Sequence, residues 1–256
     1  MTTFVKQRPD APAGFFACEA AGLRWLAVPG GARVARVLAV TDTTLVLERL
    51  TPGCPSPAGA AAFGRALAVT HAAGAPAFGS PPAGWPGDGF FGPLQDPRPL
   101  PAGAEATWGA FHARCRVRSV RDQLAAQGAL PERLDGQLER LASRLEDGTY
   151  DDDAPPSRLH GDLWSGNVVW TADGAVLVDP AAHGGHALTD LAMLDLFGLP
   201  HLDRVLDAYA EAAGDRLPDG WQDLLGLHQV YPVAMHAVLF GGGYGRRLAE
   251  LVERYT

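Results

Sequence analysis

The stretch Arg158–Pro180 reads RLHGDLWSGNVVWTADGAVLVDP and is the most informative segment of this chain. Two short apolar runs, 168–170 and 176–178, flank an Asp-Gly turn, which predicts a β-hairpin. Asn167 enters the first predicted strand and Asp179 leaves the second, so the hairpin brings both side chains to one end. Mg²⁺ is commonly held by a carboxylate, an amide oxygen and substrate phosphates. The stretch therefore predicts a magnesium site.

A potential general base precedes this hairpin. Asp162 lies in the loop that faces the predicted metal, five residues before Asn167 and two after His160. A carboxylate at this place can accept the proton of an attacking hydroxyl. Taken singly, an H-G-D triplet is common and an Asp-Gly hairpin is usually only a turn. Together, the four side chains favour a phosphotransferase that uses ATP and Mg²⁺.

Four strings extend this pattern toward the end of the chain: LHGDLWSGNVVW, VLVDPAAHGG, TDLAMLDLFG and LHQVYPVAMHAVLFGGGY. With them the chain resembles the fructosamine kinase (ketosamine 3-kinase) family. The insert 163–166 separates this group from aminoglycoside and choline kinases, which share only the H-G-D-x4-N frame. The resemblance implies an α+β, protein-kinase-like fold with two lobes. It also implies ATP-dependent phosphorylation of the third sugar hydroxyl in ketoamines, including those on glycated protein lysines, as a deglycation repair.

The sequence also predicts an ion pair near the N-terminus. Residues 3–6 predict a strand and 13–26 a helix, in which Glu19 falls on the apolar stripe. An unpaired buried carboxylate costs several kcal/mol, so a partner is expected, and Lys6 is the candidate. The family carries both residues at matching positions, where the lysine touches ATP phosphates. The alternative is a surface lysine and a half-exposed glutamate.

The next strands lead to a predicted hinge. Residues 36–40 and 45–47 form strands joined by a polar turn. Glu48 and Leu50 follow, where kinases place the backbone groups that read adenine, so both are predicted to bind the nucleotide.

A Pro- and Gly-rich passage, 52–57, then breaks regular structure. It predicts a small N-terminal nucleotide-binding lobe, residues 1–51, and a mainly helical catalytic and substrate lobe, 52–256. The same passage is equally consistent with any two-domain protein. Further helices are predicted at 58–73, 108–127 and 130–145.

Other site residues are predicted by the resemblance alone. Asp190 matches an aspartate that braces the catalytic loop through its backbone, a supporting role that His160 is predicted to share. The alternative is that Asp190 is only the N-cap of a helix, where an aspartate would be equally expected. Trp164, His236 and Tyr244 are candidates for substrate contact, although core packing explains His236 adequately.

Two side-chain patterns argue against other chemistry. His183 and His186 have a zinc-like spacing, but no Cys or third ligand accompanies them. The chain has an odd number of cysteines and no C-x-x-C motif, which predicts free thiols at Cys18, Cys54 and Cys115.

Net charge and hydropathy indicate which kinds of binding partner and which location to expect. A net charge of −8 argues against nucleic acid and anionic membranes, which bind basic surfaces. No run of 18 apolar residues and no signal peptide is present, so a cytoplasmic protein is expected. The acidic triplet 151–153 is predicted to be a solvated loop.

The chain departs from the family in two places. Ala187 and Leu188 stand where relatives carry an Arg-Glu pair, which leaves the preferred substrate open. Only five residues precede Lys6, where the family has two further strands and a Gly-rich turn over the phosphates. A small sheet of three strands with an exposed edge is therefore expected, in a monomer or weak dimer. The alternatives are an amino sugar or aminoglycoside kinase, and an inactive nucleotide-binding pseudokinase.

Overall fold

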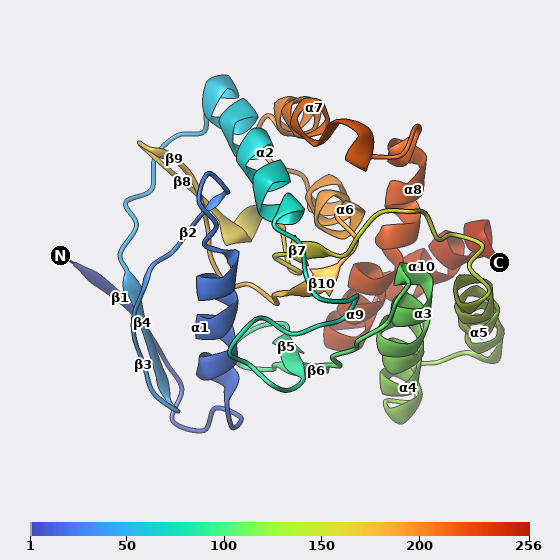
Figure 1. The fold of residues 1–256 in the computed structure, drawn as a ribbon. Helices are drawn as coiled ribbons and strands as arrows, with labels where there is room; N and C mark the ends of the chain where they lie inside the picture. Colours follow the sequence, from blue (N-terminus) through green and yellow to red (C-terminus); the bar gives the residue numbers. More distant parts are fainter. Residues whose placement is uncertain (1) are drawn as a thin grey trace.

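The computed structural model describes residues 2–256, with a small sheet at the N-terminal end and helices through most of the rest (Figure 1). The sheet has the order β1-β4-β3 and is antiparallel throughout. Its strands are β1 (Thr3–Gln7), β3 (Val37–Val40) and β4 (Thr44–Glu48). The three predicted strands are thus confirmed, and β1 lies at an edge of the sheet.

Helix α1 (Phe15–Leu26) packs beside this sheet and supplies half of the buried residues of their shared core. The side chain of Glu19 is only 8% exposed, as its place on the apolar stripe predicts. The core between α1 and the sheet also contains Val176, from a distant part of the chain, so N-terminal residues alone do not complete it. Its other buried members include Phe15, Phe16, Ala20, Leu23, Ala35, Leu45 and Leu47.

The predicted hairpin is confirmed. Strands β8 (Val168–Thr171) and β9 (Gly174–Leu177) pair antiparallel, with Thr171 opposite Gly174 across the turn. A two-residue strand that the sequence did not reveal, β2 (Arg33–Val34), pairs parallel to β9. This pairing connects the hairpin to the N-terminal part of the chain.

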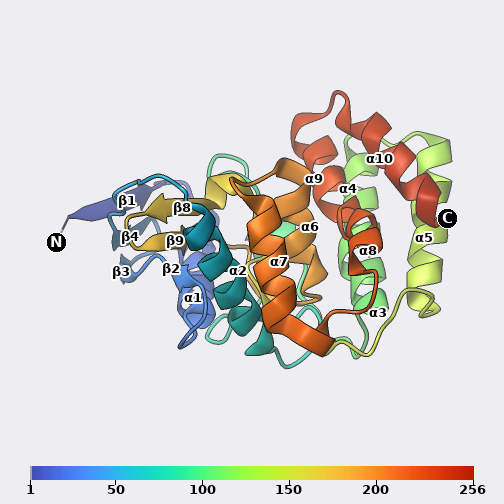
Figure 2. The ribbon, with the colours of Figure 1, turned by 90° about the horizontal axis from the view of Figure 1, so that it is seen from above.

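Next to the hairpin, helices α2 (Pro57–Ala72) and α7 (Leu202–Ala213) pack side by side (Figure 2). Their backbones approach closely at Gly64, where a Cβ atom would lie 2.2 Å from the Val205 carbonyl oxygen. Only glycine permits this distance. Ser56 begins α2 by accepting a hydrogen bond from a first-turn amide. Buried residues of α6 (Leu188–Phe197) and α8 (Trp221–His228) join those of α2, α7 and the hairpin in a second hydrophobic core.

A third group of helices lies at the end opposite the sheet (Figure 2). The predicted helix 108–127 is one helical run, interrupted by a π-helical segment. The predicted helix 130–145 begins two residues later than expected, after Pro131, and ends at Glu146. The group consists of α3 (Trp108–His112), η1 (Ala113–Arg118), α4 (Ser119–Ala126), α5 (Glu132–Glu146), α9 (Val230–Phe240) and α10 (Tyr244–Val252).

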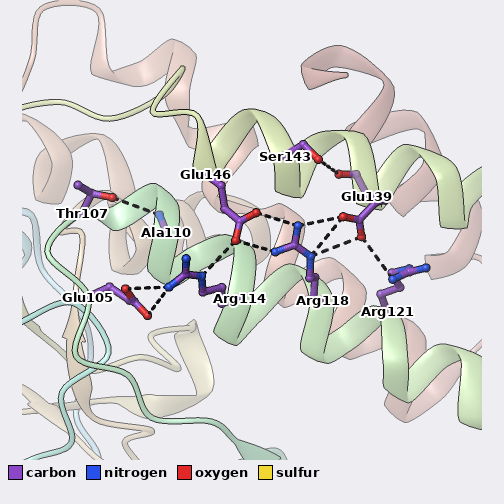
Figure 3. A network of polar contacts seen from close by, with 9 residues as sticks. All are labelled: Glu105, Thr107, Ala110, Arg114, Arg118, Arg121, Glu139, Ser143 and Glu146. Atoms are coloured by element: carbon purple, nitrogen blue, oxygen red, sulfur yellow. Dashed lines mark hydrogen bonds and ion pairs between the residues drawn. The ribbon is translucent and has the colours of Figure 1, made fainter.

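Ion pairs join the π-helical segment and α4 to α5 (Figure 3). Arg118 contacts both Glu139, at 2.9 Å, and Glu146, at 2.8 Å. Arg114 reaches Glu146 at 3.1 Å and Arg121 reaches Glu139 at 3.3 Å. Each pair is at least partly exposed and contributes modestly, but shared carboxylates fix the register of the two helices.

Several short elements were not predicted, because they are two or three residues long and depend on distant partners. The Gly- and Pro-rich stretch 79–101 contains a hairpin, and 183–185 forms a strand that pairs with 157–159. These short elements are β5 (Gly89–Phe91), β6 (Arg98–Leu100), β7 (Ser157–Leu159), β10 (His183–Gly185), η2 (Ser165–Asn167), η3 (Gly214–Arg216) and η4 (Glu253–Tyr255). Of the helices in residues 2–256, none combines the length and the apolarity needed to cross a bilayer.

The acidic triplet is a loop in which Asp152 and Asp153 are exposed, as expected, but two of its carboxylates also make specific contacts. Asp151 accepts the Gly109 N–H at the start of α3, at 2.7 Å. Asp152 lies 3.1 Å from Nε2 of His186. These contacts join residues more than 30 positions apart, which local charge patterning does not reveal.

Imidazole rings are buried in the helical core. His112 and His228 both stack on the Trp108 indole, with ring centroids 4.6 and 4.2 Å from it. Burial, with a smaller effect of Arg116, lowers the pKa of His112 to about 3, and the same causes lower that of His183 to about 3. Both rings are therefore neutral in the folded protein.

These histidines predict acid sensitivity. Below an unfolded-state pKa near 6.5 the unfolded chain binds protons that the folded chain excludes, so stability falls as pH decreases from about 6.5 toward 3. Each such histidine lowers the free energy of unfolding by about 1.4 kcal/mol per pH unit within this range. His112→Phe keeps a ring against Trp108 and removes one proton site as well as an Nε2 atom without a partner.

Urea unfolding at pH 7.5 and 5.5 is the measurement. Between pH 7.5 and 5.5 the free energy of unfolding of the variant is expected to fall by about 1 kcal/mol less than that of the parent protein. The exposed His201, changed to Asn, serves as the control and should follow the parent. An equal loss in His112→Phe and the parent would contradict the assignment.

Candidate active site

A cavity of about 480 Å³ collects side chains from both ends of the chain. Strand β1, helix α1, the β5–β6 hairpin, the loop before β8, the segment after β9 and helix α9 all contribute to it. Its lining includes Lys6, Glu19, Asp162, Asn167 and Asp179. Residues as far apart in the sequence as Phe4 and Phe240 thus face one space.

Lys6 lies between two carboxylates. Its Nζ atom is 2.7 Å from Oε1 of Glu19 and 2.6 Å from Oδ1 of Asp179. The ion pair with Glu19 is the one that the sequence predicts. Burial alone would lower the pKa of Lys6, but the charges of Glu19 and then Asp179 outweigh it and raise that pKa. The ammonium therefore stays charged inside the cavity.

The loop before the hairpin holds Asp162 and Asn167 together. Nδ2 of Asn167 donates to the Asp162 carbonyl oxygen at 2.7 Å and to its Oδ2 at 3.1 Å. Burial raises the pKa of Asp162 to about 7; the hydrogen bond from Asn167 opposes this shift, and the charge of Asp179 adds to it. A carboxylate with this pKa can both accept and release a proton near neutral pH.

Asp190 supports this loop from beneath. Its fully buried carboxylate accepts the backbone N–H of His160 at 2.7 Å and that of Gly161 at 2.9 Å. His71, from α2, lies 3.1 Å from the same carboxylate and 2.7 Å from the Tyr209 hydroxyl. Burial alone would raise the pKa of Asp190, but the contacts with His71 and Gly161 keep it below its ordinary value.

The predicted bracing contact is therefore present, and the N-cap alternative is wrong. Helix α6 begins at Leu188 after Ala187, and no side chain caps it. Asp190 lies in the first turn with its carboxylate turned to the loop.

Two backbone features shape the loop. Gly161 has a φ of 82°, and a Cβ atom there would lie 2.1 Å from the Ala181 carbonyl oxygen. Glycine is thus required on both counts. The neighbouring His160 ring is buried, and its Nε2 donates to the Val178 carbonyl at 2.9 Å, while Nδ1 accepts the Asp162 N–H at 3.3 Å. His160 thereby links the loop to the end of the hairpin.

The hairpin end offers donors that suit Mg²⁺. Asp179 adopts a φ of 54°, which is unusual for a residue other than glycine and turns the chain just after the β9 strand. Its carboxylate and the amide of Asn167 line the same cavity. Within residues 2–256 no three His, Cys, Asp or Glu side chains converge as a closed metal site would need. The donors therefore fit a cation that keeps waters or substrate oxygens, as Mg²⁺ does.

The remaining predicted residues divide into two groups. Trp164 and His236 line the cavity, whereas Tyr244 lies behind His236 with ring centroids 5.2 Å apart. Glu48 and Leu50 do not line it. Glu48 instead accepts the Arg36 N–H at 3.0 Å, and Leu50 packs against the N-terminal core. Their contact with adenine stays a prediction.

Sequence reasoning missed one wall of the cavity. Residues 90–95, from the β5–β6 hairpin, line it together with the predicted motifs. The Arg8 guanidinium donates to the Leu94 carbonyl at 2.6 Å and ties this segment to the end of β1. The pattern G-F-F-G at 89–92 was the only signal, and it was too short to assign. The His71 contact with Asp190 had no signal at all.

Solved structures of low sequence identity share this fold. A choline/ethanolamine kinase family protein from Mesorhizobium loti gives a TM-score of 0.61 at 14% identity, covering 98% of this chain and 82% of the other. An aminoglycoside phosphotransferase gives 0.57 at 16% identity, covering 99% and 85%. The fold is thus that of the protein-kinase-like phosphotransferases.

Closer relatives specify the family. The fructosamine kinase family model matches residues 1–256. A chain named as a fructosamine-3-kinase from Thermobifida fusca YX-ER1 is 44% identical, with a TM-score of 0.86, 98% of this chain and 84% of the other covered. Probable ketoamine kinases of Enterococcus faecium and Thermus thermophilus are 32% and 35% identical, covering 98% and 94% of this chain and 87% and 82% of theirs. The chain belongs to the fructosamine kinase family.

The bracing carboxylate yields a stability prediction. Asp190→Asn places an amide where two backbone N–H groups and His71 need an acceptor, which leaves buried donors unpaired. The expected loss is about 3–5 kcal/mol, as for breaking a buried charged network. Thermal and urea unfolding measure it.

Asp195 on the same helix is the matched control. It is exposed, and Asp195→Asn is expected to change stability by no more than about 0.5 kcal/mol. Equal stability of the two variants would show that Asp190 does not support the loop.

Proposed function

We propose that this protein transfers the γ-phosphoryl group of ATP to a sugar hydroxyl of a ketoamine. The observation that carries the proposal is the single cavity that joins Lys6, paired with Glu19, to Asp162 and to the hairpin end. Phosphoryl transfer depends mainly on positioning and charge neutralisation, which such a cavity supplies. The names of its relatives, ketoamine kinase and ketosamine-3-kinase, support the acceptor class.

In the proposed reaction the sugar hydroxyl oxygen attacks the γ-phosphorus, and the bond from that phosphorus to the β–γ bridging oxygen breaks. ADP leaves with the electron pair, and the hydroxyl proton passes to Oδ of Asp162. Lys6, held charged by Glu19 and Asp179, contacts the nucleotide's phosphates once it turns from Asp179. Asp190 and His160 keep the loop in place.

Asn167 and Asp179 are the proposed Mg²⁺ ligands, with phosphate oxygens and water completing the shell. Bound there, the ion would neutralise charge on the phosphates. The proposed ligand atom of Asn167 is its side-chain oxygen Oδ1, because the side-chain nitrogen Nδ2 already donates to Asp162.

The proposed organisation assigns nucleotide binding to residues 1–51, with the backbone of Glu48 and Leu50 at adenine, and acceptor binding to 52–256. The proposed substrates are small-molecule ketoamines and glycated protein lysines, which makes deglycation repair the proposed role. Trp164 and His236 contact the acceptor, since both line the cavity.

A substrate panel tests the acceptor class. Ribulosamines, fructosamines and aminoglycosides are each supplied with Mg²⁺ and ATP, and formation of ADP and of the phosphorylated product is followed. Transfer to at least one ketoamine, with none to aminoglycosides, is the expected result. Transfer to aminoglycosides alone, or ADP formation without a phosphorylated sugar, would overturn the proposal.

Asp162→Asn tests the proton acceptor. Loss of the carboxylate is expected to lower kcat by about 10²–10⁴-fold, the usual contribution of a general base. ATP binding, measured by calorimetry, should change little, because Lys6 and its partners are intact. Full turnover on the best acceptor would exclude Asp162 from this role.

Asp179→Asn tests the metal site. The neutral amide is expected to weaken the dependence of ATP binding on Mg²⁺, seen as a rise in the Mg²⁺ concentration needed for half-maximal binding. Asp173→Asn, in the exposed turn of the same hairpin, is the matched control and should behave as the parent. Identical Mg²⁺ titrations for Asp179→Asn and the parent would refute the assignment.

A further inference from the structure

One wall of the cavity presents aromatic rings to solvent. Phe240 is 62% exposed and Trp164 is 41% exposed, although both line the cavity. Their rings are connected through two others: Phe197 lies 6.4 Å from Trp164, and His236 lies 4.8 Å from Phe197 and 5.4 Å from Phe240. We call these four residues the aromatic shelf.

The shelf comes from three separate elements. Trp164 belongs to the loop that carries Asp162, Phe197 ends α6, and His236 and Phe240 lie one turn apart on α9. The His236 ring is fixed by its Nδ1 contact with the Pro232 carbonyl, at 2.7 Å. A connected set of rings, of which Trp164 and Phe240 are exposed, beside a polar reaction site is the composition of a ligand subsite.

Charge is distributed unevenly along the cavity. Its lining, within residues 2–256, contains three carboxylates, Glu19, Asp162 and Asp179, and none of them belongs to the shelf. Two of the three already neutralise Lys6. Of the acidic residues of α6, Asp195 precedes Phe197 by two positions, but it is held by Gln229 at 2.7 Å and does not line the cavity.

A positive side chain acts on one residue of the shelf. Arg247 lies close enough to His236 to lower its pKa, in addition to the larger effect of burial. An acceptor with several ammonium groups would therefore meet no counter-charge at the shelf and one like charge. An aromatic or aliphatic group would cover exposed rings at no such cost.

We infer that the aromatic shelf is a subsite for the group carried on the amine nitrogen of the ketoamine, and that it selects an aromatic or aliphatic group over a polycationic one. The inference rests on the proposed function, because the sugar hydroxyl must lie at Asp162 for the amine side to reach Trp164 and Phe240. Stacking of one ring on the shelf is expected to raise kcat/KM by about 3- to 10-fold.

The experiment uses ketoamines of one ketose made with four amines: benzylamine, hexylamine, ethanolamine and spermidine. The parent protein is expected to give the highest kcat/KM with the benzylamine and hexylamine adducts and the lowest with the spermidine adduct. Equal values for all four, or a preference for spermidine, would overturn the shelf inference and leave the proposed function standing. No transfer to any of the four would overturn both.

Phe240→Ala tests the shelf directly. The ratio of kcat/KM for the benzylamine adduct to that for the ethanolamine adduct is expected to fall by about 3- to 10-fold. Phe240 is the exposed last residue of α9, so the variant is expected to fold, and thermal unfolding checks this. Val69→Ala, at a 41% exposed position on α2 that does not line the cavity, is the control and should keep the ratio. An unchanged ratio in Phe240→Ala would contradict the inference.

Discussion

The buried carboxylate of Asp190 is the contact on which the rest of the site depends. It is fully inaccessible to solvent, yet it stays ionised because His71 and two consecutive backbone N–H groups surround it. Those amides belong to His160 and Gly161, so the carboxylate fixes the backbone that presents Asp162. A buried charge tolerates little movement of its partners, since losing one costs several kcal/mol. The loop is thereby held to a helix rather than left to its own conformation.

From this fixed loop the site extends toward the N-terminal sheet. Strand β2 pairs with β9, and Val176 enters the core beneath α1, so the hairpin and the sheet share both hydrogen bonds and apolar contacts. This connection places Asp179 within 2.6 Å of Lys6. The cation of β1 and the carboxylate after β9 therefore neutralise each other across the cavity.

The cavity joins two kinds of surface. At one end charges are paired closely, and at the other lie the exposed rings of Trp164 and Phe240, without a carboxylate between them. Such a division suits a reaction between a polyanionic donor and an acceptor that is polar at its sugar and apolar at its amine. Asp162, whose pKa is raised to about 7 by burial, lines the same cavity and lies two residues before Trp164 in the chain.

The sequence alone determined the parts that depend on short spacing: the β8–β9 hairpin, the sites of Asp162, Asn167 and Asp179, and the helix stripe that buries Glu19. Turn chemistry and helix periodicity act within a few residues, so they can be read directly. The Lys6 pair was predicted because a buried carboxylate needs a counter-charge and the family carries both residues, and the Asp190 brace was predicted from the family resemblance. Only the tertiary structure decided the contact of His71 with Asp190, the cavity wall at 90–95 and the shelf at Phe240. These join residues that are far apart in the chain, and packing of whole elements, rather than local propensity, determines which of them meet.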